Sequence, residues 1–467
     1  MRRKNKEKPI LEKVLITDVA TEGKGVGKAD DKVVFVKQNV PGDIVDIQVS
    51  KKRSNYYEGY PIKFHQYSDI RVEPFCEHFG VCGGCSRQNI IYEKQIQFKE
   101  NEVYNNLKRI GKIELPDILP ILASPLTQFY RNKLEFTFSN RRWLTSAEID
   151  QENIDTNGLG FHIPGMFNKV VDIKKCWLQD EPSNAIRLAI KEFAIQNSLS
   201  FFDFRIQKGF LRNLIIRTTS IGEVMVIIVF FHEDEKARIE IFNHLIKLFP
   251  QVTSWMYVIN SKSNDSLSDQ TVKLFHGRDY IVETLENLHF KIGPKSFFQT
   301  NSLQTLNLYR IIRDFADLSG IETVYDLYTG TGSIANFVAF KSKKVVGIEY
   351  ISEAIIDANE NSRINNISNT LFLNGDIKNI LNNQLFEKEG FPNVLITDPP
   401  RAGMHKDVTD TILNSAPEKI VYVSCNSATQ ARDINLLDSK YKVIKIQPVD
   451  MFPHTHHVEN VVLLKRK

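Results

Sequence analysis

Three side chains suited to covalent chemistry stand beside apolar runs in the last quarter of the chain. Cys425 follows residues 420–423, Asp398 follows residues 394–397, and Glu459 comes shortly before a third apolar run. Short runs rich in β-branched residues predict buried strands of a parallel sheet. Reactive groups and ligands collect just beyond the carboxyl ends of such strands. A thiol and two carboxylates at one sheet edge fit covalent catalysis assisted by a general base.

Each of these residues also has an ordinary structural explanation. A free cysteine often packs in a protein interior as a small apolar side chain, and Cys425 taken alone is interpreted that way. As a nucleophile it needs a neighbour that favours the thiolate, and Arg401 is a candidate for that neighbour. His456 and His457 are alternatives to Glu459 as the base.

Three ordered segments around these residues resemble the signature segments of the RNA uracil-C5 methyltransferases. They read DPPRAG over residues 398–403, VYVSCNSAT over 421–429 and DMFPHTHHVE over 450–459. The resemblance implies methyl transfer to C5 of a uridine in RNA. It further implies that Cys425 is the nucleophile, which forms a covalent adduct at C6, and that Glu459 is the general base.

A Gly-rich turn upstream predicts a nucleoside pocket. Residues 324–333 read as a strand followed by Thr-Gly-Thr-Gly, and residues 345–349 form a second strand that ends in Glu349. An acid at that place can accept hydrogen bonds from a ribose diol. The turn lacks the full phosphate-binding Gly pattern, so a nucleoside without a pyrophosphate fits better than a dinucleotide.

The resemblance names this nucleoside cofactor as S-adenosylmethionine. By matching positions it implies a cofactor site lined by Gln299, Tyr328, Glu349, Asp376 and Asp398. The chain departs from many family members at Thr329, where they have cysteine; this departure leaves the reaction untouched.

Four of the five cysteines are candidate metal ligands. Three lie close together, at Cys76, Cys82 and Cys85, with glycines that allow a tight loop, and Cys176 is the remaining thiol once Cys425 is assigned to catalysis. Four thiolates suit either zinc or an iron–sulfur cluster, and the spacing does not decide between them. The resemblance implies a [4Fe–4S] cluster, with zinc as the alternative.

The expected fold has three parts. Residues 1–66 alternate apolar and polar residues between Gly-rich turns, which predicts an OB-like barrel. This stretch resembles the TRAM domain, a small RNA-binding barrel. Residues 67–274 are expected to form an α+β central domain that carries the metal loop, and residues 275–467 an α/β, Rossmann-like, class I S-adenosylmethionine-dependent methyltransferase domain.

Composition bounds the partners. Net charge is only +4, but residues 1–64 hold 14 Lys and Arg against 9 Asp and Glu. A basic module on a near-neutral body fits an electrostatic grip on RNA phosphates. No apolar run approaches the ~20 residues of a membrane span. We therefore expect a cytoplasmic monomer that binds RNA and no membrane.

The RNA target is the least determined feature. A barrel together with a cysteine cluster is typical of the large-subunit rRNA enzymes of the family, so 23S rRNA is favoured and tRNA is the alternative. A non-catalytic Fe–S RNA-binding protein is the competing hypothesis from another class, although it would have no need for Cys425 with Glu459. An amino-methylating enzyme would use DPPR-like residues without a nucleophile.

Overall fold

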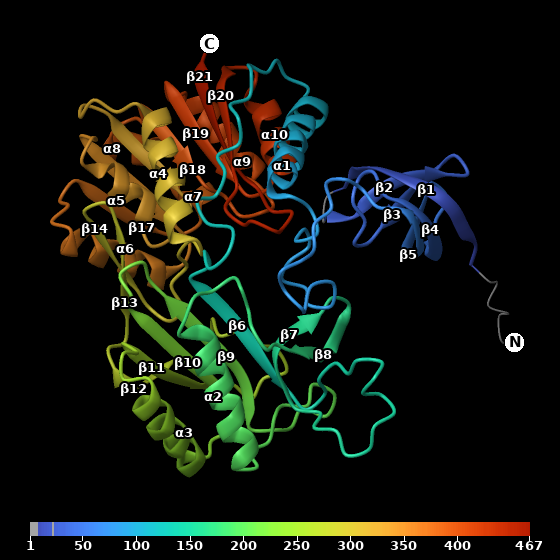
Figure 1. The fold of residues 1–467 in the computed structure, drawn as a ribbon. Coiled ribbons are helices and arrows are strands. Elements are labelled where there is room, and N and C mark those ends of the chain that lie inside the picture. The colour runs from blue at the N-terminus through green and yellow to red at the C-terminus, as the bar shows by residue number, and fades with distance from the viewer. Residues whose placement is uncertain (1–7, 21–22) are drawn as a thin grey trace, which may run out of the picture. The chain divides into compact units, whose positions relative to one another are not determined.

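A computed structural model describes residues 8–20 and 23–467. Part of the basic excess of the N-terminal stretch, at Arg2, Arg3, Lys4 and Lys6, lies outside the described residues, as does Glu22. The chain forms two compact units (Figure 1). The first comprises the residues up to Glu102 together with Phe452–His457, and the second comprises Val103–Met451 together with Val458–Lys467.

The N-terminal strands close into a barrel in the order β1-β2-β3-β5-β4. These strands are β1 (Ile10–Val19), β2 (Gly25–Ala29), β3 (Lys32–Val36), β4 (Ile44–Lys52) and β5 (Tyr56–Gln66). Alternate residues such as Val34, Val36, Val45 and Ile47 are fully buried, because successive side chains of a strand point to opposite faces. The OB-like barrel expected from the sequence is confirmed.

The segment between the barrel and the central sheet contains few regular elements. The cysteine loop, residues 76–85, is followed by α1 (Tyr92–Asn106), which ends in a π-helical turn over Leu107–Gly111. Within the first unit, α1 holds the segment Phe452–His457: Lys99 Nζ donates to the Phe452 carbonyl at 2.9 Å, and Gln95 contacts His454 Nδ1 at 3.1 Å.

The central sheet has seven strands in the order β12-β11-β10-β9-β6-β7-β8. Helices α2 and α3 lie side by side over it in Figure 1. Its elements are β6 (Lys133–Ser139), β7 (Gly158–Ile163), β8 (Met166–Asp172), α2 (Ser183–Gln196), β9 (Leu211–Thr218), β10 (Val224–Phe230), α3 (Glu235–Leu248), β11 (Ser254–Ile259) and β12 (Lys273–Gly277). A strand predicted to begin at Phe129 begins instead at Lys133, because Phe129 adopts a left-handed conformation with φ 53° that no strand accommodates. Arg131 and Lys133 therefore do not share a strand face.

The C-terminal sheet has seven strands in the order β17-β16-β15-β18-β19-β21-β20. It is preceded by the hairpin β13 (Ile281–Leu285) and β14 (Leu288–Ile292) and by α4 (Ser302–Ala316), which Asn301 caps by accepting from the Gln304 amide. The remaining elements are β15 (Thr323–Leu327), α5 (Ser333–Ala339), β16 (Lys344–Glu349), α6 (Ser352–Ile364), β17 (Thr370–Asn374), α7 (Ile377–Ile380), α8 (Asn383–Glu389), β18 (Val394–Thr397), α9 (Lys406–Ser415), β19 (Lys419–Ser424), α10 (Ser427–Leu437), β20 (Tyr441–Val449) and β21 (Glu459–Arg466).

Five strands of this sheet run parallel, and β21 runs antiparallel to both of its neighbours. Tyr325, Ile348 and Tyr422, which point to one face, pack into one apolar core with Ile412 of α9 and Ile434 of α10. Crossover helices that cover a parallel sheet in this way make the Rossmann-like architecture expected from the sequence.

The division into domains 1–66, 67–274 and 275–467 stays a prediction. Within the residues that the structure describes, no helix combines the length and the apolar character that crossing a bilayer requires.

Candidate active site

Strand pairing places Cys425 opposite Glu459. Strand β19 pairs antiparallel with β21, and Ser424 is the partner of Asn460 in that register. One step further along both strands, Cys425 and Glu459 face each other. Glu459 is only 6 % exposed, whereas Cys425 is half-buried. The carboxyl group is thus shielded from water beside a thiol that stays accessible.

Asp398 belongs to the same group of charges. It follows β18, which pairs in parallel with β19, so its carboxyl group reaches the same sheet edge. Burial raises the pKa of the Cys425 thiol to about 11, and the Glu459 and Asp398 carboxylates raise it further, while Arg401 lowers it. Burial, and then the Asp398 charge, raise the pKa of Glu459 well above its usual range. The three side chains singled out from the sequence therefore meet at one place.

The balance at Cys425 differs from the expectation that its surroundings lower the thiol pKa. Arg401 does act in that direction, but burial and two nearby carboxyl groups outweigh it. A buried group beside like charges keeps its proton more readily than one in water.

The turn that carries Arg401 is anchored by α10. Asn426, the residue after Cys425, caps this helix and its Nδ2 donates to the Arg401 carbonyl at 3.1 Å, as does Thr429 Oγ1. Asp433, buried on the same helix, accepts from the Met404 amide at 2.8 Å. These positioning residues were missed from the sequence, although their spacing of three and four residues places them on one helix face.

Gly403 completes this anchor. It has φ +80°, and a Cβ at this position would lie 2.5 Å from Arg432 Nη2 and 2.6 Å from Asp433 Oδ2. Only glycine combines this backbone conformation with such a close approach to the helix.

Replacing Arg401 should make Cys425 harder to ionise. In Arg401→Gln the thiol loses the one positive neighbour that lowers its pKa, so the fraction of thiolate falls at any pH below that pKa. We expect iodoacetamide to alkylate the Cys425 peptide severalfold more slowly at pH 8 and its rate profile to move to higher pH. Arg401→Lys keeps the charge and serves as the control. An unchanged profile in Arg401→Gln would show that Arg401 does not act on the thiol.

The Gly-rich turn after β15 forms the second half of the site. Gly330 has φ +55°, its amide donates to Glu349 Oε2 at 3.1 Å, and a Cβ built there would meet only open space. The backbone is therefore accessible to a ligand next to a carboxylate. In the adjoining strand the Gly375 amide donates to the Glu349 carbonyl at 2.8 Å, which holds Asp376 beside Glu349.

Tyr328 lies among these acids. Burial raises the pKa of its hydroxyl to about 12, and the charges of Asp433, Asp376 and Glu349 contribute to the rise. Its left-handed backbone, φ 63°, turns the chain out of β15 toward the glycines. The expected cofactor residues Tyr328, Glu349 and Asp376 thus come together at the ends of three neighbouring strands.

Gln299 reaches this region through the segment before α4. Asn132 Nδ2 donates to the Gln299 carbonyl at 3.0 Å, and Thr331 Oγ1 of the Gly-rich turn lies 3.5 Å from the Phe297 carbonyl. A buried acid beneath the turn, Asp326, was missed from the sequence; Thr329 Oγ1 donates to it at 2.5 Å. Hydroxyl donation by Thr329 gives a local function to the position where this chain departs from its family.

The donor set and the open turn fit the nucleoside part of S-adenosylmethionine. Carboxylates accept from ribose hydroxyl and adenine amino groups, and a turn at a strand end without a phosphate-gripping Lys suits a ligand without a pyrophosphate. Asp398 lies between this pocket and Cys425, since its charge acts on Asp326 as well as on Cys425.

The cysteine loop is a compact turn within the first unit. The Phe79 amide donates to the Cys76 carbonyl at 3.0 Å, the Cys82 amide donates to the His78 carbonyl at 2.9 Å, and the Gly84 amide donates to Cys82 Sγ at 3.4 Å. Amides of His78 and Phe79 lower the pKa of Cys76, although burial raises it overall. These sulfur-directed N–H groups suit thiolates.

Cys176, in the second unit, is held by a separate network. Its amide donates to Asn184 Oδ1 at 2.8 Å, and its carbonyl accepts from Asn184 Nδ2 at 3.1 Å. Among residues 8–20 and 23–467, the structure shows no group of three His, Cys, Asp or Glu side chains that could hold a metal ion.

Two family models match the chain. Residues 265–467 match "tRNA (Uracil-5-)-methyltransferase" and residues 12–62 match the TRAM domain. Proteins of similar sequence are named "Uncharacterized RNA methyltransferase": one from Bacteroides thetaiotaomicron is 56 % identical over 96 % of this chain and 100 % of its own length, and one from Porphyromonas gingivalis is 55 % identical over 97 % and 99 %.

A solved structure is similar over the whole chain. It is the crystal structure of the Pyrococcus abyssi tRNA (uracil-54, C5)-methyltransferase in complex with S-adenosyl-L-homocysteine, with 28 % identity and a TM-score of 0.74. The alignment covers 96 % of this chain and 99 % of that one.

Proposed function

The chain belongs to the RNA uracil-C5 methyltransferase family and is an S-adenosylmethionine-dependent enzyme, and on that premise we propose that it methylates C5 of a uridine in 23S rRNA through a covalent adduct at Cys425. The observation that carries the covalent mechanism is the pairing of β19 with β21, which sets a half-buried thiol opposite a buried carboxyl group. Membership of an enzyme family removes the reason to retain a non-catalytic Fe–S protein as an alternative.

The proposed reaction begins with the Cys425 thiolate, which Arg401 favours. The sulfur bonds to C6 of the uracil ring, and the electron pair of the C5–C6 double bond makes C5 nucleophilic. When bound, S-adenosylmethionine supplies the methyl group that C5 takes up. Glu459 then removes the C5 proton, and the bond between sulfur and C6 breaks to release 5-methyluridine and the thiolate.

The raised pKa of Glu459 supports its proposed role. A carboxylate with a raised pKa is a stronger base than an ordinary one, and rates improve as the pKa of a base approaches the working pH. The charges that act on the Cys425 thiol come from carboxylates and an arginine. Glu459 is therefore preferred to His456 and His457.

The cofactor is proposed to lie over the Gly-rich turn. Glu349 and Asp376 would accept hydrogen bonds from its ribose and adenine, Tyr328 would pack against it, and Gln299 and Asp398 would close the pocket toward the reacting atoms. Burial at this edge of the sheet excludes water from the thiol and from C5.

Cys76, Cys82, Cys85 and Cys176 are proposed to hold a [4Fe–4S] cluster. Four soft thiolates suit iron–sulfur ligation, and the N–H groups directed at the loop sulfurs support that ligand set. A zinc ion bound by the same thiolates is the alternative. The group would be structural, since the reaction above needs no electron transfer.

Protein purified without oxygen should be brown and hold about four irons per chain. Cys176→Ser should lose the iron and the visible absorbance together and lower the melting temperature, because three ligands do not close the site. Cys425→Ala, which removes the one cysteine outside the ligand set, should keep both and is the matched control. Stoichiometric zinc in a colourless protein would replace the cluster by the alternative.

The RNA target is chosen between two candidates. The barrel with the cysteine loop favours 23S rRNA, whereas the similar archaeal enzyme, whose full length this chain matches, acts on tRNA. The division of labour follows from the proposed domains: residues 1–66 and 67–274 hold RNA while residues 275–467 act as a monomer on one base.

Mapping of 5-methyluridine in a strain without this gene separates the two targets. We expect the modification to disappear from 23S rRNA and to persist in tRNA, and to return when the wild-type gene is supplied but not with Cys425→Ala. Loss from tRNA alone would assign the enzyme to the second candidate.

A further inference from the structure

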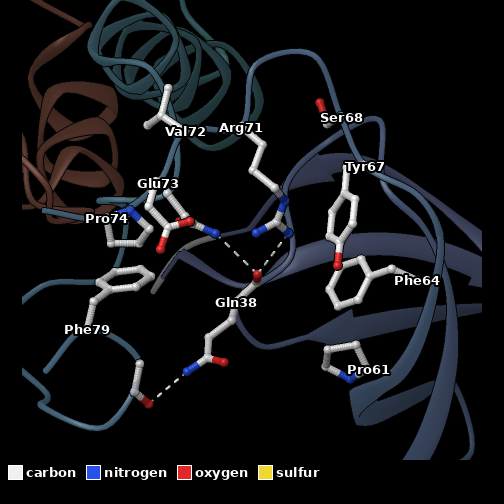
Figure 2. A pocket seen from close by; sticks show the side chains of 12 residues that line it. Gln38, Pro61, Phe64, Tyr67, Ser68, Arg71, Val72, Glu73, Pro74 and Phe79 are labelled. Carbon is white, nitrogen blue, oxygen red and sulfur yellow. Dashed lines mark hydrogen bonds between the residues drawn. The ribbon is translucent and has the colours of Figure 1, made fainter. Parts of the chain in front are cut away.

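A hollow of about 610 Å³ lies within the first compact unit, between β5 and the cysteine loop. Figure 2 shows Phe64 and Tyr67 on one side and Pro74 and Phe79 on the other, with Arg71 toward the middle. Its volume falls within the roughly 300–1,000 Å³ of pockets that enclose small ligands. The reaction proposed above makes no use of it.

One wall of the hollow is a rigid stacking platform. The rings of Phe64 and Tyr67 are stacked with centroids 4.8 Å apart and an angle of 20°, and the Arg71 guanidinium lies 5.2 and 5.5 Å from the two centroids. Buried Asp43 fixes Arg71 by accepting from Nε at 3.2 Å and from Nη2 at 2.5 Å. Despite this support the Tyr67 side chain is 61 % exposed. A fixed but exposed aromatic group offers a flat face to a ligand.

The floor of the hollow is held by backbone contacts. The Gln38 carbonyl accepts from Arg71 Nη2 at 3.3 Å and from Asn89 Nδ2 at 3.2 Å, and Gln38 Nε2 donates to the Gly80 carbonyl at 2.7 Å (Figure 2). Gly80 is required here, because it has φ +90° and a Cβ would lie 2.6 Å from Gln38 Nε2. The barrel and the cysteine loop thereby form one site.

Glu73 supplies a free acceptor at the rim. Its carboxylate lines the hollow and makes no hydrogen bond or ion pair within the residues that the structure describes. A carboxylate of this kind accepts from the exocyclic amino group of a base, whereas it repels the carbonyl oxygens of uracil.

We propose that this hollow binds one unpaired base of the RNA substrate, distinct from the methylated uridine, and that it selects a base with an exocyclic amino group. Bases have the two features that the walls match, a π face for stacking on aromatic rings and a polar edge. The basic excess of residues 1–64 favours the phosphates on either side of that base. The inference rests on the proposed function, because it takes RNA as the substrate.

The test uses the full-length protein and a single-stranded adenylate octamer that carries one 2-aminopurine, whose fluorescence falls when it stacks. Wild-type protein should quench it and bind it more tightly than the uridylate octamer. Tyr67→Ala should bind the adenylate octamer about tenfold to a hundredfold more weakly and lose the quenching. Glu73→Ala should abolish the preference for adenylate over uridylate.

Tyr104→Ala, which removes a 40 % exposed tyrosine of α1, is the matched control and should behave as wild type. Unchanged binding of S-adenosylmethionine shows that each variant is folded. Affinity or quenching in Tyr67→Ala equal to that of wild type would overturn the proposal. Failure of the proposed function looks different: wild-type protein would form no 5-methyluridine, while the effects of Tyr67 and Glu73 on octamer binding would remain.

Discussion

Cys425→Ala should bind RNA and S-adenosylmethionine like the wild type and yet form no 5-methyluridine. Without the thiol nothing bonds to C6, so C5 never becomes nucleophilic, and we expect the rate to fall by on the order of 10³-fold or more. The small side chain leaves β19 and its pairing intact, because Cys425 lies one residue beyond the strand. Single-turnover methylation with labelled cofactor measures the rate, and equilibrium binding of each ligand measures the rest.

The control separates a nucleophile from a structural cysteine. Cys176→Ala removes the one fully enclosed thiol, so it should affect stability first, with activity lost in proportion to the unfolded fraction. Cys425→Ala should keep the melting temperature of the wild type. If the folded Cys425→Ala protein still makes 5-methyluridine, the covalent mechanism is wrong for this enzyme.

Glu459→Gln should trap the enzyme on its RNA. Thiol attack and methyl transfer precede the step that needs the base, so both should still occur, whereas removal of the C5 proton should slow by about 10² to 10⁴-fold. The sulfur cannot leave until that proton is gone. A covalent protein–RNA complex should therefore accumulate, visible as a shifted band that survives denaturant, and the trapped RNA should already carry the methyl group.

Asp398→Asn provides the sharpest comparison, because Asp398 acts on the same thiol. It should reduce methylation without accumulating the methylated complex, since its proposed contacts are with the cofactor. Accumulation in Asp398→Asn but not in Glu459→Gln would exchange the two roles. Normal turnover by Glu459→Gln would move the base to His456 or His457, and alanine variants of these would then show the trap.

The sequence alone determined the parts that depend on local pattern. Strands β18 and β19 fall where the apolar runs 394–397 and 420–423 predicted them, because a fully buried parallel strand must be apolar on both faces. The helix after Asn301 and the hairpin formed by β9 and β10 were predicted for similar reasons, since caps and tight turns are encoded by a few neighbouring residues. A resemblance of three short segments supplied the reaction and the cofactor.

The tertiary structure decided the features that depend on pairing and burial between distant residues. Strand β21 enters the sheet antiparallel between β19 and β20, and only that register sets Glu459 opposite Cys425. The thiol pKa moved upward, contrary to expectation, because burial and two carboxyl groups outweigh one arginine. Segment 450–459, continuous in sequence, divides between two compact units after His457, so its histidines and Glu459 have different surroundings. The cost of burying a charge is set by every neighbour around it, and no spacing along the chain contains that information.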